Sequence, residues 1–366
     1  MKKTGIYIHI PFCEKKCPYC DFYSRSGTDK LYNEYTEAML GMIGSCAYRK
    51  EYIADSLYFG GGTPGLLGAE RLISLVGAVK GSFGLDTDNS EVTAEINPSK
   101  QDIDLELLRK GGVNRISIGV QSADDSELTF LGRQHSSSDA AEFIRLAKKA
   151  GFENISLDLM IALPGQTKES LSRSVDFCVR NGAKHISAYI LKIEPGTVFY
   201  RKRDSLSLPD DDEAAELYFH LCRLMKEYGF EHYEISNFCR SGFEGRHNLK
   251  YWHDEEYLGF GPSAHSFMEG RRFFIPRSFS DFYSGAVTDD GEGGSEEEYI
   301  MLALRLSEGV NFQKFSERFG YELPGKYIKK SRPLESAGLL KISSGSVALT
   351  EKGFLLSNSV ISVLLS

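Results

Sequence analysis

The sequence of 366 residues contains no apolar run close to the ~20 residues that a membrane-spanning helix requires. It also lacks an excess of positive charge: the net charge is −8 and no stripe of Lys and Arg stands out. This balance argues against nucleic-acid binding, because phosphate contacts need clustered cations. Lys2 and Lys3 precede an apolar run that is short, is interrupted by His9 and has no small-residue cleavage site, so no signal peptide is predicted.

Cysteine and tryptophan are scarce. Trp252 is the single tryptophan, and the seven cysteines are an odd number of which only three are clustered. Such usage suits a reducing compartment, and we expect a cytoplasmic protein. We interpret the four scattered cysteines as buried small hydrophobic residues: Cys46, Cys178, Cys222 and Cys239.

The first two-thirds of the chain alternates between β-rich runs and runs of helical period. Strands are predicted at Ile6–Ile10, Ser56–Phe59, Glu91–Ile96, Arg115–Val120, Ile155–Ile161 and His185–Ile190. Helices are predicted near 30–45, 69–80, 102–110, 139–150 and 168–181, the third capped by Asp102. This βα alternation predicts a parallel sheet with helices outside, as a partial barrel or as an open α/β sheet.

The remaining third has weaker patterns. A connection is predicted over 194–212, a helix over 212–228, a strand at HYEIS, and ordered loops around a site over 238–270, where aromatic, His and Gly residues are dense. The acidic, glycine-rich segment 288–298 is the best candidate for a linker. Helices near 296–307, 311–319 and 326–337 precede a hairpin that turns at Gly345, a pattern typical of a winged helix. We therefore divide the chain into a core (1–235), a connecting segment (236–290) and a smaller, mainly helical C-terminal domain (291–366).

Three thiols lie on one short loop directly after the first strand, in GIYIHIPFCEKKCPYCDFY: Cys13, Cys17 and Cys20. Cysteine thiolates are the usual ligands of iron–sulfur cubes, and three of them leave one iron open. A zinc site is an alternative, with His9 or Asp21 as the fourth ligand. A dithiol of Cys17 and Cys20 is another, but it leaves Cys13 unexplained.

The C-x3-C-x2-C spacing, with Tyr19 before the last cysteine, resembles the radical S-adenosylmethionine (SAM) superfamily. The resemblance implies a [4Fe-4S] cluster whose open iron is chelated by SAM, and a six-unit partial (β/α) barrel. The surrounding words YIHIPFC and CPYCDF are similar to the oxygen-independent coproporphyrinogen III oxidase group and to its heme-chaperone relatives, the HemW family.

Polar residues after the strands indicate a site at one end of the sheet. Three glycines in YFGGGTP follow the second strand, where the backbone can approach a ligand closely. In the later strands Glu95, Gln121 and Asp158 share the face opposite to the apolar residues, so they are predicted to point inward. By resemblance, the SAM contacts are Tyr7, Tyr19, Gly61, Gly62, Thr63, Glu95, Gln121, Arg133 and Asp158.

Two departures from the oxidase pattern favour the HemW type. Phe22 stands where the oxidases carry a further cysteine, which argues against oxidase activity and leaves SAM cleavage undecided. The stretch RHNLKYW matches the HNxxYW pattern of HemW, which implies heme contacts from His247, Asn248, Tyr251 and Trp252, with His265 as a second choice. Lys192 also replaces a smaller apolar residue at a SAM-contacting position of the oxidases.

The sequence thus favours a chaperone that binds heme and a SAM-chelated cluster and passes heme to an acceptor apo-hemoprotein. The chain itself has no predicted membrane segment, but its acceptor can be associated with a membrane. The alternative is an oxidase that uses a 5′-deoxyadenosyl radical to decarboxylate the propionates of a porphyrinogen. A metal-binding regulator built on the C-terminal helices is a third, weaker hypothesis, because those helices lack strong basicity.

Overall fold

The computed structural model describes residues 1–98 and 103–366. Six parallel strands form its centre and pair in chain order, each with the next. They are β1 (Lys2–Ile10), β2 (Tyr52–Gly61), β3 (Glu91–Ile96), β4 (Arg115–Gln121), β5 (Asn154–Ile161) and β6 (His185–Ile190). All six strands predicted from the sequence are confirmed.

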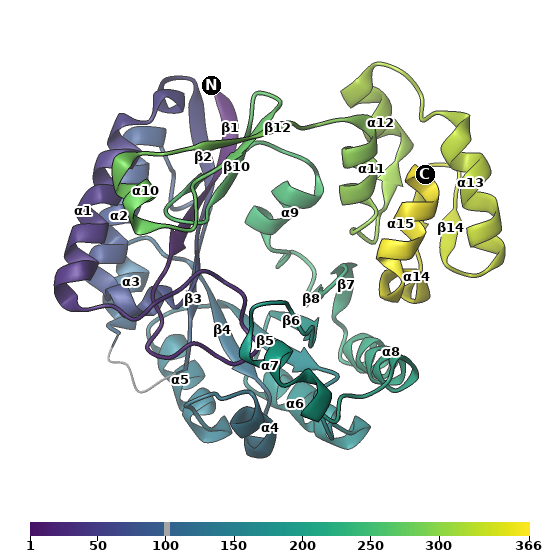
Figure 1. The fold of residues 1–366 in the computed structure, drawn as a ribbon, viewed down its shortest axis with the longest axis horizontal. Coiled ribbons are helices and arrows are strands. Elements are labelled where there is room, and N and C mark those ends of the chain that lie inside the picture. The colour runs from purple at the N-terminus through teal and green to yellow at the C-terminus, as the bar shows by residue number, and fades with distance from the viewer. Residues whose placement is uncertain (99–102) are drawn as a thin grey trace.

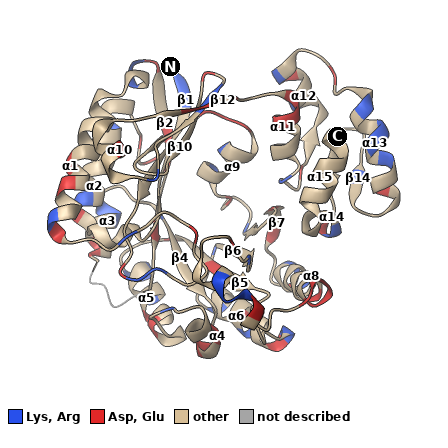
Figure 2. Cartoon of the chain, in the orientation of Figure 1, with Lys and Arg blue, Asp and Glu red and all other residues tan. Residues whose placement is uncertain are grey.

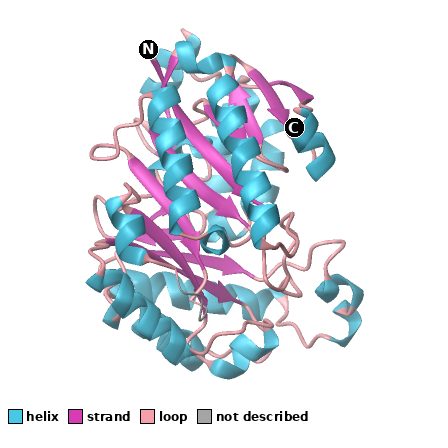
Figure 3. Cartoon of the chain, turned by 90° about the vertical axis from the view of Figure 1, so that its left-hand side faces the viewer, coloured by secondary structure: helices cyan, strands magenta, loops and turns pink. Residues whose placement is uncertain are grey.

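Helices cover the outer face of these strands (Figures 1 and 3). They are α1 (Asp29–Ser45), α2 (Ala69–Phe83), α3 (Leu105–Lys110), α4 (Asp125–Phe130), α5 (Ser137–Lys149) and α6 (Lys168–Arg180), with 3-10 turns η1 (Ala47–Lys50) and η2 (Pro64–Leu67). Helix α4 was not predicted. Asp102, the predicted cap of the third helix, lies outside the described residues, and the side chain of Asp104 accepts from the Leu107 amide at the start of α3.

The apolar faces of the strands pack against these helices. Ile116, Ile118 and Leu157 are fully buried in the main hydrophobic core. The opposite, inward face carries polar side chains, among them Arg115, which is 2% exposed. Apolar side chains outside and polar side chains inside are the arrangement expected of a partial barrel whose interior serves a site.

Beyond the six central strands the sheet continues at both edges, and it has twelve strands within the described residues. Helices α7 (Val198–Arg201) and α8 (Asp211–Glu227), with η3 (Arg203–Ser205), precede β7 (Glu231–Glu234) and β8 (Asn237–Cys239), which lie antiparallel beyond β6. Strand β9 (Tyr257–Phe260) pairs parallel with β1, and β10 (His265–Met268), β11 (Arg271–Phe274) and β12 (Thr288–Glu292) follow antiparallel. The short helices α9 (Arg246–Trp252) and α10 (Phe279–Ser284) lie between them in the chain.

Two predictions for this region are wrong. Residues 238–270 are not loops alone, because they contribute strands to the sheet, and residues 288–292 are strand β12 rather than part of a free linker. The strands concerned have only three to five residues each, which is too short for a period-2 pattern to register.

The last part of the chain forms a helical unit with a small sheet (Figure 1). Its elements are α11 (Glu296–Ala303), β13 (Val310–Asn311), α12 (Phe312–Phe319), α13 (Gly325–Ser336), β14 (Leu340–Ile342), β15 (Ser346–Leu349), α14 (Glu351–Leu355) and α15 (Ser357–Leu365). Strand β15 pairs with both β13 and β14, as in a winged helix, and the predicted hairpin at Gly345 is confirmed. The whole is an α/β fold: a six-unit partial barrel followed by a mainly helical C-terminal part. The three-part division at 235 and 290 stays a prediction.

Acidic and basic side chains are interspersed over the outer helices, and α13 carries several Lys and Arg (Figure 2). Within residues 1–98 and 103–366, no helix combines the length and the apolar character needed to cross a bilayer.

Candidate functional site

The cysteine loop leaves the end of β1 and is fixed by its own backbone. The amide of Cys13 donates to the Arg25 carbonyl at 3.0 Å, and the Arg25 amide donates to the Pro11 carbonyl at 2.9 Å. Phe12 is fully buried between the rings of Tyr32 and Tyr35, with centroids 4.8 and 5.3 Å away. The loop is therefore held in place at both ends.

The glycine turn after β2 clamps the same loop. The amides of Gly62 and Thr63 donate to the carbonyls of Ile10 and Phe12 at 2.8 and 2.7 Å. A Cβ atom at Gly62 would stand 2.4 Å from the Phe12 carbonyl oxygen, so only glycine permits this approach. Apart from any ligand contact, the turn thus has a structural role.

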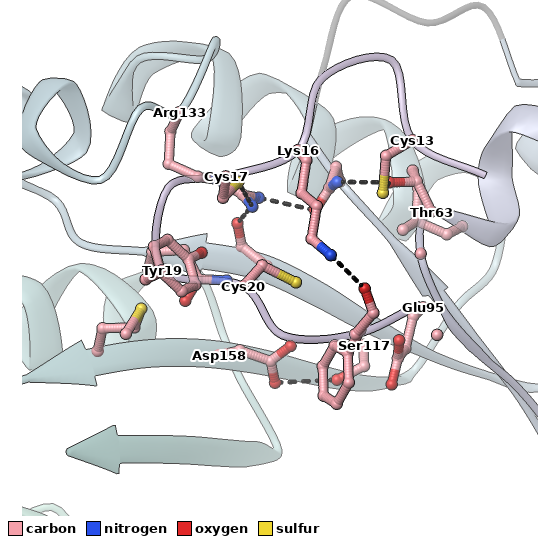
Figure 4. A pocket seen from close by; sticks show the side chains of 18 of the residues that line it. Cys13, Lys16, Cys17, Tyr19, Cys20, Thr63, Glu95, Ser117, Arg133 and Asp158 are labelled. Carbon is pink, nitrogen blue, oxygen red and sulfur yellow. Dashed lines mark hydrogen bonds between the residues drawn. The ribbon is translucent and has the colours of Figure 1, made fainter. Parts of the chain in front are cut away.

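A cavity of about 350 Å³ opens between the cysteine loop and the inward faces of the strands. Figure 4 shows Cys13, Cys17 and Cys20 on one side of it and Glu95, Ser117 and Asp158 on the other. Of the residues predicted to hold the cluster and SAM, those that line it are Cys13, Cys17, Tyr19, Cys20, Gly61, Gly62, Thr63, Glu95, Gln121, Arg133 and Asp158. Gln121 lines it from a left-handed backbone, φ 67°, at an irregularity in β4.

Tyr7 is the exception. It is not among the residues that line this cavity, and its hydroxyl forms a hydrogen bond of 3.0 Å with Nδ1 of His9. Lys192, whose identity departs from the oxidase pattern, is exposed and does not line the cavity either.

Two carboxyl groups on the cavity wall have raised pKa values. Burial raises the pKa of Glu95 to about 7, although the Tyr58 hydroxyl donates to its Oε1 at 2.8 Å and opposes the rise. Burial also raises the pKa of Asp158, against hydrogen bonds from Ser187 and from Ser117 at 3.0 Å. Both groups accept hydrogen bonds and are available to pair with the hydroxyl groups or the cation of a ligand.

The three cysteines suit a cluster better than a single zinc ion. In the described part of the chain, no three His, Cys, Asp or Glu side chains converge as one metal ion would require. The proposed fourth zinc ligands are engaged elsewhere: Nε2 of His9 bonds to the Tyr23 carbonyl at 3.0 Å, and Asp21 lies 3.7 Å from Arg277. Three thiols spread around the mouth of a cavity match the separate iron corners of a cube.

Two of the sulfurs receive hydrogen bonds from neighbouring side chains. Thr63 Oγ1 donates to Cys13 Sγ at 3.6 Å, and Arg133 NH1 donates to Cys17 Sγ at 3.7 Å (Figure 4). Burial raises the pKa of the Cys20 thiol.

The HNLKYW stretch forms α9, away from this cavity. The His247 ring is fully buried, with Nδ1 2.9 Å from Ser56 Oγ and Nε2 2.8 Å from the Tyr251 hydroxyl. Burial lowers the pKa of His247 to about 3, so the ring is neutral. Both nitrogens are occupied, so in this conformation neither is available to an iron atom.

Three of the other predicted heme residues lie on the same helix as His247, and the fourth lies on another element. Asn248, Tyr251 and Trp252 are partly buried on the same short helix, and the ring of His247 also stacks on Tyr58 with centroids 5.3 Å apart. His265 is exposed on β10, where it stacks on Phe274 at 5.1 Å. The structure does not bring His265 together with α9 in any described contact.

Sequence reasoning missed several contributors to the site. Asn97 lines the cavity and hydrogen-bonds to both Thr63 and Arg133, and Ser117, Met160 and Tyr189 line it from β4, β5 and β6. Strand parity places Asn97 on the inward face, which is the one feature that points to it in the sequence.

The comparisons with known proteins agree with this geometry. The pattern of the radical SAM superfamily matches residues 7–178, and that of the HemN C-terminal domain matches residues 297–356. The heme chaperone HemW of Bacillus subtilis is 36% identical, with 98% of each chain covered. This chain belongs to the HemW family of the radical SAM superfamily.

Other relatives support the assignment. The heme chaperone HemW of Lactococcus lactis is 34% identical, with 98% of this chain and 96% of the relative covered. The solved structure of coproporphyrinogen III oxidase (HemN) from Escherichia coli, described as a radical SAM enzyme, superposes with a TM-score of 0.85 at 20% identity, over 100% of this chain and 90% of that one. The shared fold thus includes the C-terminal part.

Proposed function

We propose that this protein is a heme chaperone of the HemW type. It binds a [4Fe-4S] cluster through Cys13, Cys17 and Cys20, binds SAM in the adjoining cavity, and passes heme to an acceptor apo-hemoprotein. We expect it to act in the cytoplasm, where the acceptor is either soluble or associated with a membrane.

One observation carries the choice between chaperone and oxidase. At the mouth of the cavity stands Phe22, 64% exposed, where the oxidase group carries a further cysteine. The cavity therefore keeps the thiols needed for a cluster but has no fourth thiol at this position. The similarity over nearly the full length of the HemW chaperones supports the same choice.

The cavity residues fit the cofactors chemically. The three thiols supply three corners of a cube, and the cluster supplies an open iron to which SAM binds. Arg133 has two NH2 hydrogens committed, to Asn97 Oδ1 at 2.7 Å and the Gly119 carbonyl at 2.8 Å, and retains N–H groups for a carboxylate. We expect Glu95 and Asp158, which line the cavity, to accept hydrogen bonds from hydroxyl groups of SAM.

Heme binding at α9 requires a change in the position of His247. A ring nitrogen becomes available to iron only if the hydrogen bond with Ser56 or with Tyr251 breaks. We propose that heme binds to a state in which this helix has moved away from β2. The apparent affinity is then reduced by the small population of that state.

The cluster is tested by iron and sulfide analysis after anaerobic reconstitution. Cys17→Ala should lose the cluster, whereas Cys222→Ala, a buried cysteine on α8, should retain it. Full iron and sulfide in Cys17→Ala would refute the assignment of the ligands.

Heme binding is tested by titration of wild type, His247→Ala and Ser56→Ala, following the Soret band and the emission of Trp252. His247→Ala should bind heme more weakly. Ser56→Ala should bind it more tightly, because it frees Nδ1, the nitrogen that loses its partner when α9 moves away from β2. Equal affinity in all three proteins would remove His247 from the heme site.

The second candidate function is porphyrinogen decarboxylation. Its support is the match to the radical SAM pattern and the fold shared with coproporphyrinogen III oxidase. It is tested by anaerobic incubation of reconstituted wild type with SAM, a reductant and coproporphyrinogen III. Decarboxylated product at enzymatic turnover would establish the oxidase in place of the chaperone.

A further inference from the structure

One asparagine connects two of the three cysteines through hydrogen bonds. Asn97 follows β3, and its Nδ2 donates to Thr63 Oγ1 at 2.9 Å while its Oδ1 accepts from Arg133 NH2 at 2.7 Å. Thr63 in turn donates to Cys13 Sγ at 3.6 Å, and Arg133 donates to Cys17 Sγ at 3.7 Å. The described residues thus form a continuous chain of four hydrogen bonds from one sulfur to the other.

The directions of these hydrogen bonds show that Asn97 orients the donor groups of both Thr63 and Arg133. A threonine hydroxyl has a single hydrogen, and because Asn97 donates to the oxygen, that hydrogen is left for the Cys13 sulfur. On the other arm, Asn97 Oδ1 and the Gly119 carbonyl hold NH2 of Arg133, so the plane of the guanidinium is fixed with NH1 directed at Cys17. The amide has only one orientation that serves both partners, since its oxygen must face the guanidinium.

There is little free space around the contact between Asn97 and Arg133. A Cβ atom at Gly119 would lie 3.0 Å from Asn97 Oδ1 and 3.1 Å from Arg133 NH2. The contact between Asn97 and Arg133 therefore depends on a glycine in the adjacent strand.

We propose that Asn97 is a positioning residue that orients two hydrogen-bond donors toward Cys13 and Cys17 and so raises the reduction potential of the bound cluster. Hydrogen bonds to cluster sulfurs are one of the determinants of its potential, because they stabilise the more negative, reduced form. Thr63 and Arg133 make the contacts with sulfur, and Asn97 acts through them. The proposal rests on the proposed function in that it requires these cysteines to hold a cluster.

The test is a redox titration of the anaerobically reconstituted full chain without SAM, in which dithionite supplies one electron to the cluster and EPR reports the reduced form. Asn97→Leu keeps the approximate volume and removes both arms, and Thr63→Val removes only the arm to Cys13. Thr63→Ser keeps the hydroxyl group and should therefore have the wild-type midpoint potential. Ser117→Ala is the matched control, because Ser117 lines the same cavity but donates to Asp158 rather than toward a cysteine.

We expect the equilibrium constant for reduction to fall about tenfold in Asn97→Leu, which corresponds to a midpoint ~59 mV more negative for a one-electron couple. Thr63→Val should shift the midpoint in the same direction by less, and Ser117→Ala should not shift it. A cluster-loaded Asn97→Leu with the wild-type midpoint would overturn the proposal. If Asn97→Leu takes up no cluster, a wild-type midpoint in Thr63→Val would overturn it instead. A wild type that takes up no iron or sulfide would overturn the cluster assignment itself, which is a different result.

Discussion

Two buried glutamates should make the free energy of unfolding depend on pH in the same way, but only one of them should affect the affinity for SAM. Burial raises the pKa of Glu95 and of Glu234 from 4.5 to about 7. Each therefore favours the folded state while it is protonated, and that contribution is lost as the pH rises from about 4.5 through about 7. Glu95 lines the cavity, whereas Glu234 lies on β7 outside the residues that line it.

We predict that Glu95→Gln and Glu234→Gln each flatten the fall in the free energy of unfolding between pH 5 and pH 8, by up to about 3 kcal/mol. Urea unfolding of the ligand-free protein at both pH values measures this. Calorimetric titration at pH 7.5 should show weaker SAM binding for Glu95→Gln, by about 2 kcal/mol, and unchanged binding for Glu234→Gln. An equal loss of SAM affinity in both variants would count against a specific contact from Glu95.

At the scale of residues, the sequence predicted what is local. Three thiols on one loop and three glycines after one strand are visible in a single window, and strand parity placed Glu95 and Asp158 on the inward face. Asn97 was not predicted as a site residue, because its partners Thr63 and Arg133 are 34 and 36 residues away and only the fold brings them together. The burial of His247 depends likewise on Ser56, 191 residues away.

Among the elements, α9 depends on a carboxylate from another element for its first turn. The amides of Arg246 and His247 donate to the two oxygens of Glu91 at 2.9 and 3.0 Å, and Glu91 is the first residue of β3. Lys250 on the same helix pairs with Asp55 on β2 at 3.0 Å. A helix of seven residues is too short to be stable alone, so these contacts hold it in place.

Glu91→Gln should therefore loosen α9 more than its small change in shape suggests. A carboxamide is neutral and offers one acceptor oxygen in place of two, so one of the two helix amides loses its acceptor and the other keeps only a neutral hydrogen bond. We expect the free energy of unfolding to fall by about 2 kcal/mol, with faster hydrogen exchange over residues 246–252. Glu106→Gln is the control, because Glu106 is exposed on α3 and lies 3.9 Å from Lys110. Exchange in α9 at the wild-type rate would contradict this account of how the helix is held.

Element prediction succeeded where strands and helices were long. Strands β1 to β6 have six to ten residues and clear patterns, whereas β7 to β12 have three to five and were mostly taken for loops or a linker. The short strands form because a neighbour offers a free edge: β9 pairs with β1, and β8 pairs with β6. That information belongs to the sheet rather than to any one segment of sequence.

At the scale of the whole molecule, backbone hydrogen bonds and ion pairs between side chains join the C-terminal part to the barrel. The amide of Ile235 donates to the Arg305 carbonyl at 2.9 Å, and the amide of Ser307 donates to the Tyr233 carbonyl at 3.0 Å. Near α9, the Asp254 side chain is fully buried and lies 2.9 Å from Arg272 on β11 and 2.6 Å from Arg318 on α12. Arg272 also pairs with Glu298 on α11 at 2.6 Å.

Asp254 should therefore link the folding of the two parts. Asp254→Asn leaves Arg318 without its carboxylate partner and Arg272 with Glu298 alone. Breaking a buried ion pair costs about 3 to 5 kcal/mol, and we expect the lower end of this range because both arginines are partly exposed. We expect calorimetry to show a lower first transition and a separation of the unfolding of residues 291–366 from that of the barrel. Asp289→Asn provides the matched control: Asp289 also pairs with an arginine of β11, Arg271, but both side chains are about half exposed, so the loss should be below about 1 kcal/mol. If Asp254→Asn unfolds in one transition at the wild-type temperature, the ion cluster does not couple the C-terminal part to the barrel. Other contacts between the two parts then maintain the connection, among them the backbone pairing at Tyr233 and Ile235 and the contact between the rings of His232 and Phe354.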